Sequence, residues 1–300
     1  MRIGIIGAGF VGEAYRRLFL RVPGEVVIID REWVHVYGAW PDGKVTVSEA
    51  PDVVTDSRRV RFAVECDMLF LCLPTERKDA KSDVSEPDLT ALEWWIEQLG
   101  KAKYRGVVVI KSTVPPGFTN EHELGESFDE TLRLVHSPEY VGASQYYTPP
   151  QYPHPTDLHT HKFVILGGLD EDTEEVAQAL LPIMGPGCEF CFCTATESEL
   201  VKYIVNSWGA MKVTIWGEYY ELAKKLELNF ANVRTLVLKD RRIDPMHTAV
   251  FAGKLGFGNS HCFVKDMAAL AHLAEVLGNP MEMVSAAIRK NGIWKRKLKA

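Results

Sequence analysis

The sequence lacks the features that mark several classes of protein. None of its apolar runs is long enough to cross a bilayer, since the longest, such as Met68–Leu73, have the length of a β-strand. Basic residues do not dominate, and a net charge of −6 argues against a general nucleic-acid-binding protein. There is no leader of charged and then apolar residues with a small-residue cleavage site. We therefore expect a cytoplasmic protein that binds neither membrane nor nucleic acid.

The cysteines and histidines do not form the patterns that bind a metal. The six cysteines are predicted to be thiols, because disulfides are rare in the cytoplasm. Cys188, Cys191 and Cys193 lack a second ligand pair at the spacing of a zinc site, so we interpret them as part of a core strand. The histidines of the Tyr146–His161 segment lie among prolines, and we expect them to face solvent. No metal site is predicted.

Strand and helix patterns alternate over the first two thirds of the 300 residues. Short apolar runs are separated by segments whose apolar residues recur every three or four positions. Strands are expected at Arg2–Ile6, Glu25–Asp30, Met68–Leu73, Val107–Ile110, Leu132–His136, Phe163–Leu166 and Cys188–Cys193, and helices at Phe10–Leu20, Pro87–Leu99 and Glu171–Met184. This alternation predicts an α/β domain over residues 1–195, with a mostly parallel sheet that helices cover on both faces.

The pattern changes near Thr196 and becomes helical. Apolar residues recur at three- and four-residue steps from Glu197 to about Leu228, which predicts an unusually long helix. Further helices are expected at Asn232–Lys239, Lys265–Leu277 and Met281–Lys290. We therefore predict an all-helical domain over residues 196–300, built on one long central helix. That helix has more apolar positions than one small domain can bury, so we expect it to form the core of a homodimer.

A glycine-rich loop joins the first strand to the first helix. The spacing of Gly7, Gly9 and Gly12 permits a tight turn and lets the backbone approach a pyrophosphate, which the helix N-terminus also faces. Asp30 ends the next strand, where its carboxylate would bind the adenosine ribose and repel a 2′-phosphate. This context predicts a Rossmann-type, doubly wound sheet that binds NAD through Gly7, Gly9, Phe10, Val11, Gly12 and Asp30. Arg31 would favour NADP, and a glycine turn without a cofactor is the alternative.

Reactive side chains are also concentrated between Gly256 and Asp266. Cys262, Lys265 and Asp266 offer a thiol nucleophile, a cation and a carboxylate within five positions. A thiol beside a nicotinamide can capture the aldehyde that a first hydride transfer from an alcohol produces. With the dinucleotide loop, this pattern predicts oxidation of an alcohol past the aldehyde to an acid. The alternative is a buried structural cysteine.

Several motifs occur in a fixed order along nearly the whole chain. The most specific is Lys111–Gly117, which reads Lys-Ser-Thr-Val-Pro-Pro-Gly. The others are Leu73-Pro74-Thr75, Ser137-Pro138-Glu139-Tyr140, Glu199, Lys202, Asn206, Glu218, Asp240-Arg241-Arg242-Ile243, the cysteine segment and Asn291. The ordered set resembles the UDP-glucose/GDP-mannose family of nucleotide-sugar 6-dehydrogenases.

The resemblance implies a four-electron oxidation of a nucleotide sugar at its C6 hydroxyl, with NAD as the acceptor. UDP-glucose to UDP-glucuronate is the reference reaction, and the uronic acid would serve polysaccharide biosynthesis. Cys262 would form a thiohemiacetal and then a thioester, while Lys202 and Asn206 would hold the oxyanion. Asp266 and Thr113 would position a water molecule.

The resemblance also implies contacts outside these catalytic groups. Glu139 would assist proton transfer. Cofactor contacts are implied for Pro74, Thr75 and Thr113, and substrate contacts for Lys202, Arg242, Phe257, Gly258 and Lys265. Arg242 would reach into the site of a neighbouring subunit, which again implies a dimer.

The sequence departs from the family's pattern in several places. One extra residue separates the glycines from Cys262, Asn259 replaces a glycine, and Val264 replaces a proline. Ala143 stands where the family usually has a glutamate. The chain also stops where the family's third, nucleotide-binding domain would begin. We therefore expect a different substrate, another element that holds the nucleotide, or a partner chain that supplies the missing domain.

Two other functions fit the same residues. A two-electron dehydrogenase of the hydroxyacid type would use Lys202 and Asn206 as its catalytic pair, and Cys262 would be incidental. A NAD-binding relative without turnover would act as a sensor or an assembly subunit. The number of NADH molecules released per substrate, and the presence of an acid product, separate these alternatives from the four-electron oxidation.

Overall fold

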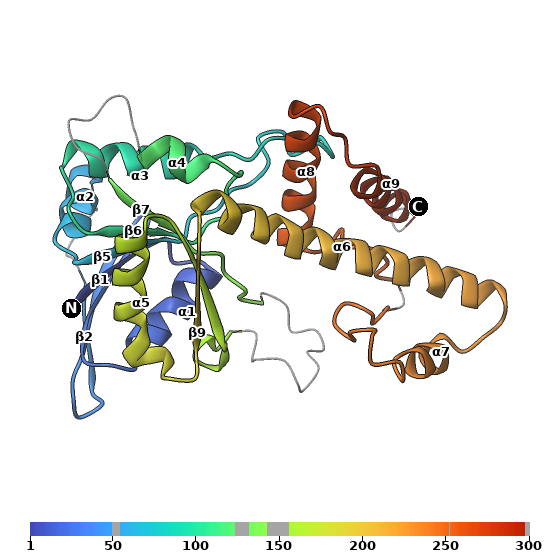
Figure 1. The fold of residues 1–300 in the computed structure, drawn as a ribbon, viewed down its shortest axis with the longest axis horizontal. Coiled ribbons are helices and arrows are strands. Elements are labelled where there is room, and N and C mark those ends of the chain that lie inside the picture. Colours follow the sequence, from blue (N-terminus) through green and yellow to red (C-terminus); the bar gives the residue numbers. More distant parts are fainter. Residues whose placement is uncertain (50–54, 124–131, 143–155, 252, 298–300) are drawn as a thin grey trace. The chain divides into compact units, whose positions relative to one another are not determined.

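The computed structural model describes residues 1–49, 55–123, 132–142, 156–251 and 253–297 (Figure 1). The described residues fall into two compact units. Unit 1 comes from residues 1–75, 89–142 and 156–202, and unit 2 from residues 76–88 and 203–297. The long helix α6 (Ala195–Lys225) contributes its first eight residues to unit 1 and the remainder to unit 2.

Unit 1 is built on a sheet that has nine strands among the described residues. Their order is β4-β3-β2-β1-β5-β6-β7-β8-β9. The strands are β1 (Arg2–Ile6), β2 (Gly24–Ile29), β3 (Val34–Ala39), β4 (Val45–Glu49), β5 (Met68–Leu71), β6 (Val107–Ile110), β7 (Arg133–His136), β8 (Phe163–Gly167) and β9 (Glu189–Cys193). The run β2-β1-β5-β6-β7 is parallel throughout. This confirms the predicted Rossmann-type, mostly parallel sheet.

Antiparallel pairs lie at both ends of the parallel run. A hairpin of β3 and β4 extends the sheet beyond β2, and β8 runs antiparallel to β7. The hairpin was not predicted. The strand that carries Cys191 and Cys193 is present as β9, but it is the terminal strand of the sheet and both thiols are partly exposed. Cys188, which directly precedes β9, is buried in an apolar core, so the interpretation as a core strand was wrong for Cys191 and Cys193 only.

Two apolar cores cover the two faces of the sheet. Side chains alternate between the faces along each strand, so that Ile3 and Ile5 of β1 lie in one core and Ile6 in the other. Helices α1 (Phe10–Phe19) and α5 (Asp170–Met184) pack on the first face. Helices α2 (Asp56–Val64), α3 (Thr90–Lys101) and α4 (Phe118–Glu123) supply side chains to the second core. The sheet is therefore covered on both faces, as predicted.

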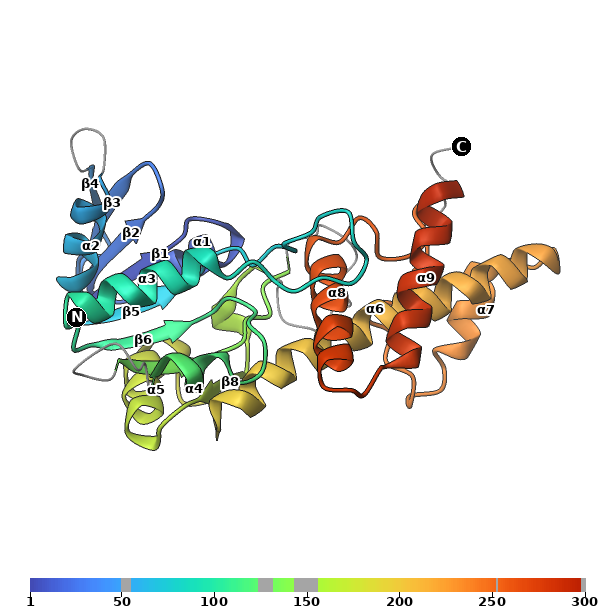
Figure 2. The same cartoon turned by 90° about the horizontal axis from the view of Figure 1, so that it is seen from above.

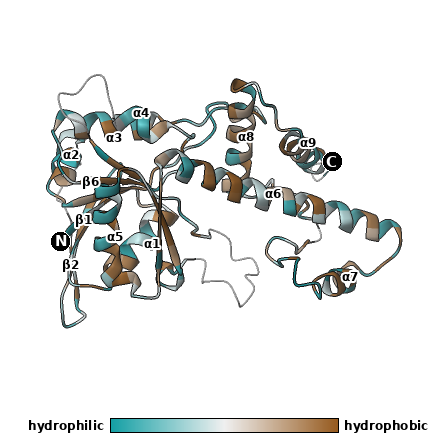
Figure 3. Cartoon of the chain, viewed as in Figure 1, coloured by the Kyte–Doolittle hydropathy of each residue, from teal (hydrophilic) through white to brown (hydrophobic). Residues whose placement is uncertain are grey.

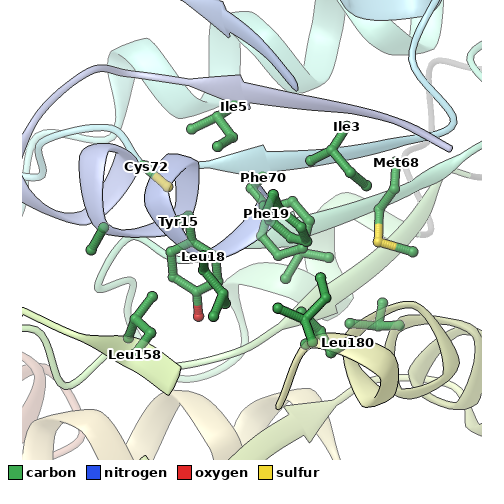
Figure 4. Close-up of a cluster of buried hydrophobic side chains, with 14 of the residues drawn as sticks. Ile3, Ile5, Tyr15, Leu18, Phe19, Met68, Phe70, Cys72, Leu158 and Leu180 are labelled. Carbon is green, nitrogen blue, oxygen red and sulfur yellow. The ribbon is translucent and has the colours of Figure 1, made fainter. Parts of the chain in front are cut away.

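Aromatic side chains dominate the first core where α1 crosses the sheet. Figure 4 shows Tyr15, Leu18 and Phe19 of α1 gathered against Phe70 of β5. The ring centroids of Phe19 and Phe70 are 4.9 Å apart, and those of Tyr15 and Phe70 are 5.3 Å apart. Such pairs stabilise the contact beyond the burial of their apolar area. This packing fixes α1, and with it the glycine-rich loop that precedes α1.

Unit 2 is helical in its described part. It contains most of α6 together with α7 (Phe230–Val237), α8 (His261–Val276) and α9 (Glu282–Lys297). Its core joins Tyr203 and Ala210 of α6 with Met267 and Leu270 of α8 and Val284 of α9. The turned view in Figure 2 shows α7 folding back beside the C-terminal part of α6.

Many apolar side chains of α6 remain exposed. Figure 3 shows apolar residues recurring along this helix. Ile204, Trp208 and Leu222 are all more than half exposed, and so is Leu226 directly after the helix. None of the helices in the described residues combines the length and the apolar character needed to cross a bilayer.

Two further predictions about local structure need correction, and two helices were missed. Helix α8 begins at His261, four residues before the predicted start, so Cys262 lies in a helix and not in a loop. His161 is buried, against the expectation that the histidines face solvent, and follows a short 3₁₀ helix, η1 (Leu158–Thr160). Helices α2 and α4 were not predicted. Ala143 and His154 lie outside the described residues.

Candidate active site

The glycine-rich loop has the geometry that a pyrophosphate requires. Gly7 has a φ of +100°, in the region that only glycine adopts easily. A Cβ on Gly12 would lie 1.9 Å from the carbonyl oxygen of Gly7, so no larger residue fits there without moving the backbone. A Cβ on Gly9 would meet nothing within 4 Å. The loop is thus closed toward the protein at Gly12 and open at Gly9.

Asp30 is held in place by the same loop. Its Oδ2 accepts a hydrogen bond from the Ala8 amide at 2.9 Å, and its Oδ1 accepts one from the Arg31 amide at 2.7 Å. Helix α1 has no side-chain cap at Gly9, and the side chain of Phe10 is 67% exposed. The first amides of a helix have no partner within the helix and suit a phosphate. The predicted residues therefore fit a dinucleotide.

Other predicted cofactor residues follow the neighbouring strands. Strand β2 pairs with one edge of β1, and β5 pairs with its other edge. The order of the strands therefore reverses at β1. Dinucleotides bind at the carboxyl ends of strands at such a point. Pro74 and Thr75 follow β5, and Thr113 follows β6. Thr75 and Thr113 are buried, and Pro74 is exposed.

Lys202 and Glu139 form a buried ion pair in unit 1. The Lys202 Nζ lies 3.0 Å from the Glu139 Oε1 and also donates a hydrogen bond to the Glu139 carbonyl oxygen. The second carboxylate oxygen of Glu139 accepts a hydrogen bond from the Val141 amide at 2.7 Å. Both side chains are more than nine-tenths buried. The pair therefore holds an amine and a carboxylate in fixed positions.

Lys111, to which no individual role was assigned from the sequence, lies beside this pair. Its Nζ donates to the Ser137 Oγ at 2.9 Å and sits 4.8 Å from the centre of the Tyr15 ring. Burial lowers the pKa of Lys111 to about 7, although Cys72 and Glu139 oppose the shift. A small pocket is lined by Lys111, Tyr15, Glu139, Tyr140, His161 and apolar residues. The sequence signal was present, since Lys111 directly follows a fully buried strand.

Cys262 and its neighbours form a second group of functional side chains, in unit 2. Ser260 caps α8, since its Oγ accepts a hydrogen bond from the Phe263 amide at 3.2 Å. Cys262 therefore lies in the first turn of the helix, where the helix dipole favours a thiolate. Lys265 and Asp266 follow one turn later.

Asp266 contacts two other predicted site residues, Asn206 and Lys265. It is 2% exposed, and its Oδ2 accepts a hydrogen bond from the Asn206 amide nitrogen. Its Oδ1 lies 2.7 Å from the Lys265 Nζ. Lys202 and Asn206 are one turn apart on α6, and each is hydrogen-bonded to an acid of its own unit. The prediction that these two residues hold an oxyanion remains a prediction.

The segment before Cys262 is anchored by α9. The Phe257 amide donates to the Asn291 Oδ1 at 2.9 Å, and the Phe257 ring lies in the core of unit 2. Gly256 has a φ of +76°, and a Cβ there would lie 2.5 Å from the Asn291 Oδ1 and 2.9 Å from the Trp294 ring. Gly258 is half-buried. Asn291 and Trp294 therefore set the path of the backbone that leads to Cys262.

In the described part of the chain, Arg242 forms no hydrogen bond or ion pair with any of these groups. Its side chain is 89% exposed and forms an ion pair with Asp240 at 2.6 Å. Among the described residues, no cluster of three or more histidines, cysteines or acids could hold a metal ion.

Proteins of known activity are similar to this chain along nearly its whole length. A UDP-glucose 6-dehydrogenase of Rhizobium meliloti (strain 1021) is 29% identical over 321 residues, which cover 99% of this chain and 68% of the relative. A solved UDP-glucose dehydrogenase from the hyperthermophilic archaeon Pyrobaculum islandicum has a TM-score of 0.75 at 23% identity, covering 97% of this chain and 68% of its own. A UDP-D-ManNAc dehydrogenase from Pyrococcus horikoshii has a TM-score of 0.67 at 21% identity, covering 98% and 69%. The two structures share the fold of this chain.

The two parts of the chain each match a domain of one family. Residues 1–183 match the UDP-glucose/GDP-mannose dehydrogenase family, NAD binding domain, which confirms NAD as the cofactor predicted from the glycine loop. Residues 196–292 match the central domain of the same family. The chain therefore belongs to the UDP-glucose/GDP-mannose dehydrogenase family of NAD-dependent oxidoreductases.

Proposed function

We propose that the chain oxidises the C6 hydroxyl of a nucleotide sugar to a carboxylate in a four-electron reaction. The observation that carries this proposal is the position of Cys262 in the first turn of α8, one turn before the buried Asp266. A two-electron dehydrogenase needs no thiol there, whereas capture of an aldehyde does. UDP-glucose is the first candidate substrate, because similar proteins carry that name.

The proposed reaction uses Cys262 as a covalent carrier. NAD, when bound, supplies the acceptor for both hydrides. Oxidation of the alcohol gives an aldehyde, and the Cys262 Sγ then bonds to the aldehyde carbon to form a thiohemiacetal. Oxidation of this adduct gives a thioester, and water breaks the carbon–sulfur bond, which releases the carboxylate and restores the thiolate. One alcohol, one water and two NAD⁺ thus yield one carboxylate, two NADH and three protons.

The remaining site residues have proposed roles in charge and proton handling. Lys202 and Asn206 would stabilise the oxyanion of the adduct as cation and amide donor. Glu139, already paired with Lys202, would assist proton transfer. Asp266 and Thr113 would orient the hydrolytic water. Phe257 and Gly258 would contribute through the backbone, since the Phe257 ring is buried in the core.

We also propose that α6 forms the core of a homodimer. Six apolar residues project within about 60° of one another around an ideal helix and are each at least 43% exposed: Ile204, Trp208, Ile215, Tyr219, Leu222 and Leu226. Such a continuous apolar stripe is typical of an interface. Arg242, exposed on its own chain, would then reach a second subunit. Trp208→Glu should convert the dimer to a monomer in light scattering, and a native protein that is monomeric at high concentration would contradict this proposal.

Three finer assignments complete the proposal. The cysteines are all free thiols, which supports a reducing compartment such as the cytoplasm. We propose that the boundary between a NAD-binding domain and a helical domain lies near residue 195. The uronic acid product would supply polysaccharide biosynthesis.

Counting NADH tests the proposed reaction. Purified protein is incubated with NAD and a panel of nucleotide sugars, UDP-glucose first, and NADH and acid are measured per sugar consumed. We expect two NADH and one acid, and we expect Cys262→Ser to abolish acid formation while NADH binding survives. One NADH without acid would favour the two-electron alternative. NADH binding without turnover on any sugar would favour a non-catalytic relative.

A further inference from the structure

We infer that Glu199 is a positioning residue that holds the Thr113 segment of the NAD site against the beginning of α6. Glu199 lies on α6 and is fully buried, with 0% of its surface exposed. A buried carboxylate is costly unless its charge is compensated. In the described part of the chain no lysine or arginine forms an ion pair with it. Hydrogen-bond donors must therefore supply the compensation.

Three donors from one turn converge on the Glu199 carboxylate. The Gly117 amide donates to Oε2 at 2.6 Å, and the Thr119 amide and hydroxyl donate to Oε1 at 2.8 and 2.6 Å. Burial raises the pKa of Glu199, while these hydrogen bonds act in the opposite direction. Charge-assisted hydrogen bonds of this kind are the strong ones. The contacts join positions 80 or 82 residues apart in sequence, so they define tertiary structure.

The sequence of the turn leaves few other donors for this task. Residues 115 and 116 are prolines and have no amide hydrogen, so Gly117 offers the first main-chain donor after Val114. Gly117 has a φ of +103°, a backbone conformation that glycine adopts at little steric cost. Thr119 lies in the first turn of α4, where amides lack helical partners. The turn is thus built to meet a carboxylate.

Neighbouring residues of α6 fix the adjacent strand end in the same way. The Ser198 Oγ lies 2.8 Å from the His136 Nδ1 at the end of β7, and Lys202 pairs with Glu139 just beyond it. Glu199 is the member of this row that reaches the segment after β6, which carries Thr113. Loss of its charge should therefore let Thr113 move relative to Lys202, without changing any residue that touches the cofactor.

A double-mutant cycle between Glu199 and Thr113 tests this role. The role of Thr113 in orienting water rests on the proposed function, so the main readout is instead the Kd for NADH, which needs no turnover and reports the predicted contact of Thr113 with the cofactor. We expect Glu199→Gln to raise that Kd about tenfold in the native background, but less than about twofold when Thr113 is already alanine, because coupled residues are not additive. Equal factors in both backgrounds, or no change in the native one, would overturn the proposal.

Further variants separate positioning from folding. Thr119→Val removes only the hydroxyl donor and should reproduce part of the effect even if Glu199→Gln folds poorly. Glu197→Gln on the same helix is the matched control, because Glu197 is exposed and glutamine also completes its cap with Thr194. A lower Tm with no coupling to Thr113 would show a merely structural role. Coupling in NADH binding without turnover on any sugar would support the role of Glu199 and contradict the proposed reaction.

Discussion

The two units place their functional side chains by different means. In unit 1 most of these side chains follow the carboxyl ends of parallel strands, where Asp30, Thr75, Thr113 and Glu139 stand directly after β2, β5, β6 and β7 or within a few residues of them, whereas Lys202 lies on α6. In unit 2 Cys262, Lys265 and Asp266 lie in the first turns of α8, so their positions depend on where α8 begins. A strand end is set by a buried apolar run, whereas a helix start is set by a single cap. Changes in the two units should therefore have different consequences.

The buried ion pair of unit 1 should show the largest effect on stability. Glu139→Gln removes the carboxylate from Lys202, whose side chain is 6% exposed. Removing one partner of a buried pair costs about 3–5 kcal/mol. The matched change in unit 2 is Asp266→Asn, which should cost less, because Lys265 is 15% exposed and can reach water. Urea unfolding of both variants checks this order, and equal losses would remove the proposed difference between the units.

Two variants of the glycine-rich loop should distinguish a steric clash within the protein from a steric clash with the cofactor. Gly12→Ala places a Cβ 1.9 Å from the Gly7 oxygen, so it should lower both stability, by about 1–3 kcal/mol, and NADH affinity. Gly9→Ala meets no protein atom within 4 Å. It should therefore keep the Tm and still weaken NADH binding, measured by fluorescence titration. A Gly9→Ala protein with native affinity would show that the backbone at Gly9 does not approach the pyrophosphate.

The lowered pKa of Lys111, in unit 1, predicts that the free energy of unfolding depends on pH. This pKa falls from an ordinary value of 10.5 to about 7 on folding, so between these values the unfolded state binds the extra proton. The free energy of unfolding should therefore rise with pH from about 7 to 10.5, by at most about 1.4 kcal/mol per pH unit. Lys111→Met should abolish this contribution, which is measured as the difference between the two proteins' urea midpoints across pH. Parallel pH curves for the two proteins would contradict the assigned shift.

The sequence predicted the helices of unit 2, with the start of α8 displaced by four residues, whereas the elements that it missed, β3, β4, α2 and α4, all lie in unit 1. Seven of the strands were predicted from apolar runs such as Val107–Ile110, which forms a strand over those four residues. The glycine-rich loop directly follows the first of these strands. The β3–β4 hairpin was missed although Pro41-Asp42-Gly43, a turn sequence, separates its β-branched runs. The partners of the site residues were not predictable, because Lys202 with Glu139 and Asn206 with Asp266 join positions about 60 residues apart. The spacing of apolar residues predicts which face of a helix is apolar, but it does not predict which residues that face contacts.

Removing the cap at the start of α8 should have the smallest effect on stability, and that effect should be local. Ser260→Ala removes the oxygen that accepts the Phe263 amide, and loss of such a cap costs about 1 kcal/mol. The first turn of α8 should then fray, which weakens the favourable position of the Cys262 thiolate at the helix N-terminus. We expect the rate of Cys262 modification by a thiol reagent to fall at pH 7 relative to its rate at high pH. Ser260→Thr, which keeps a hydroxyl acceptor at the cap without adding a charge, should retain the native pH dependence, because what matters for Cys262 is an ordered helix start and not the serine itself.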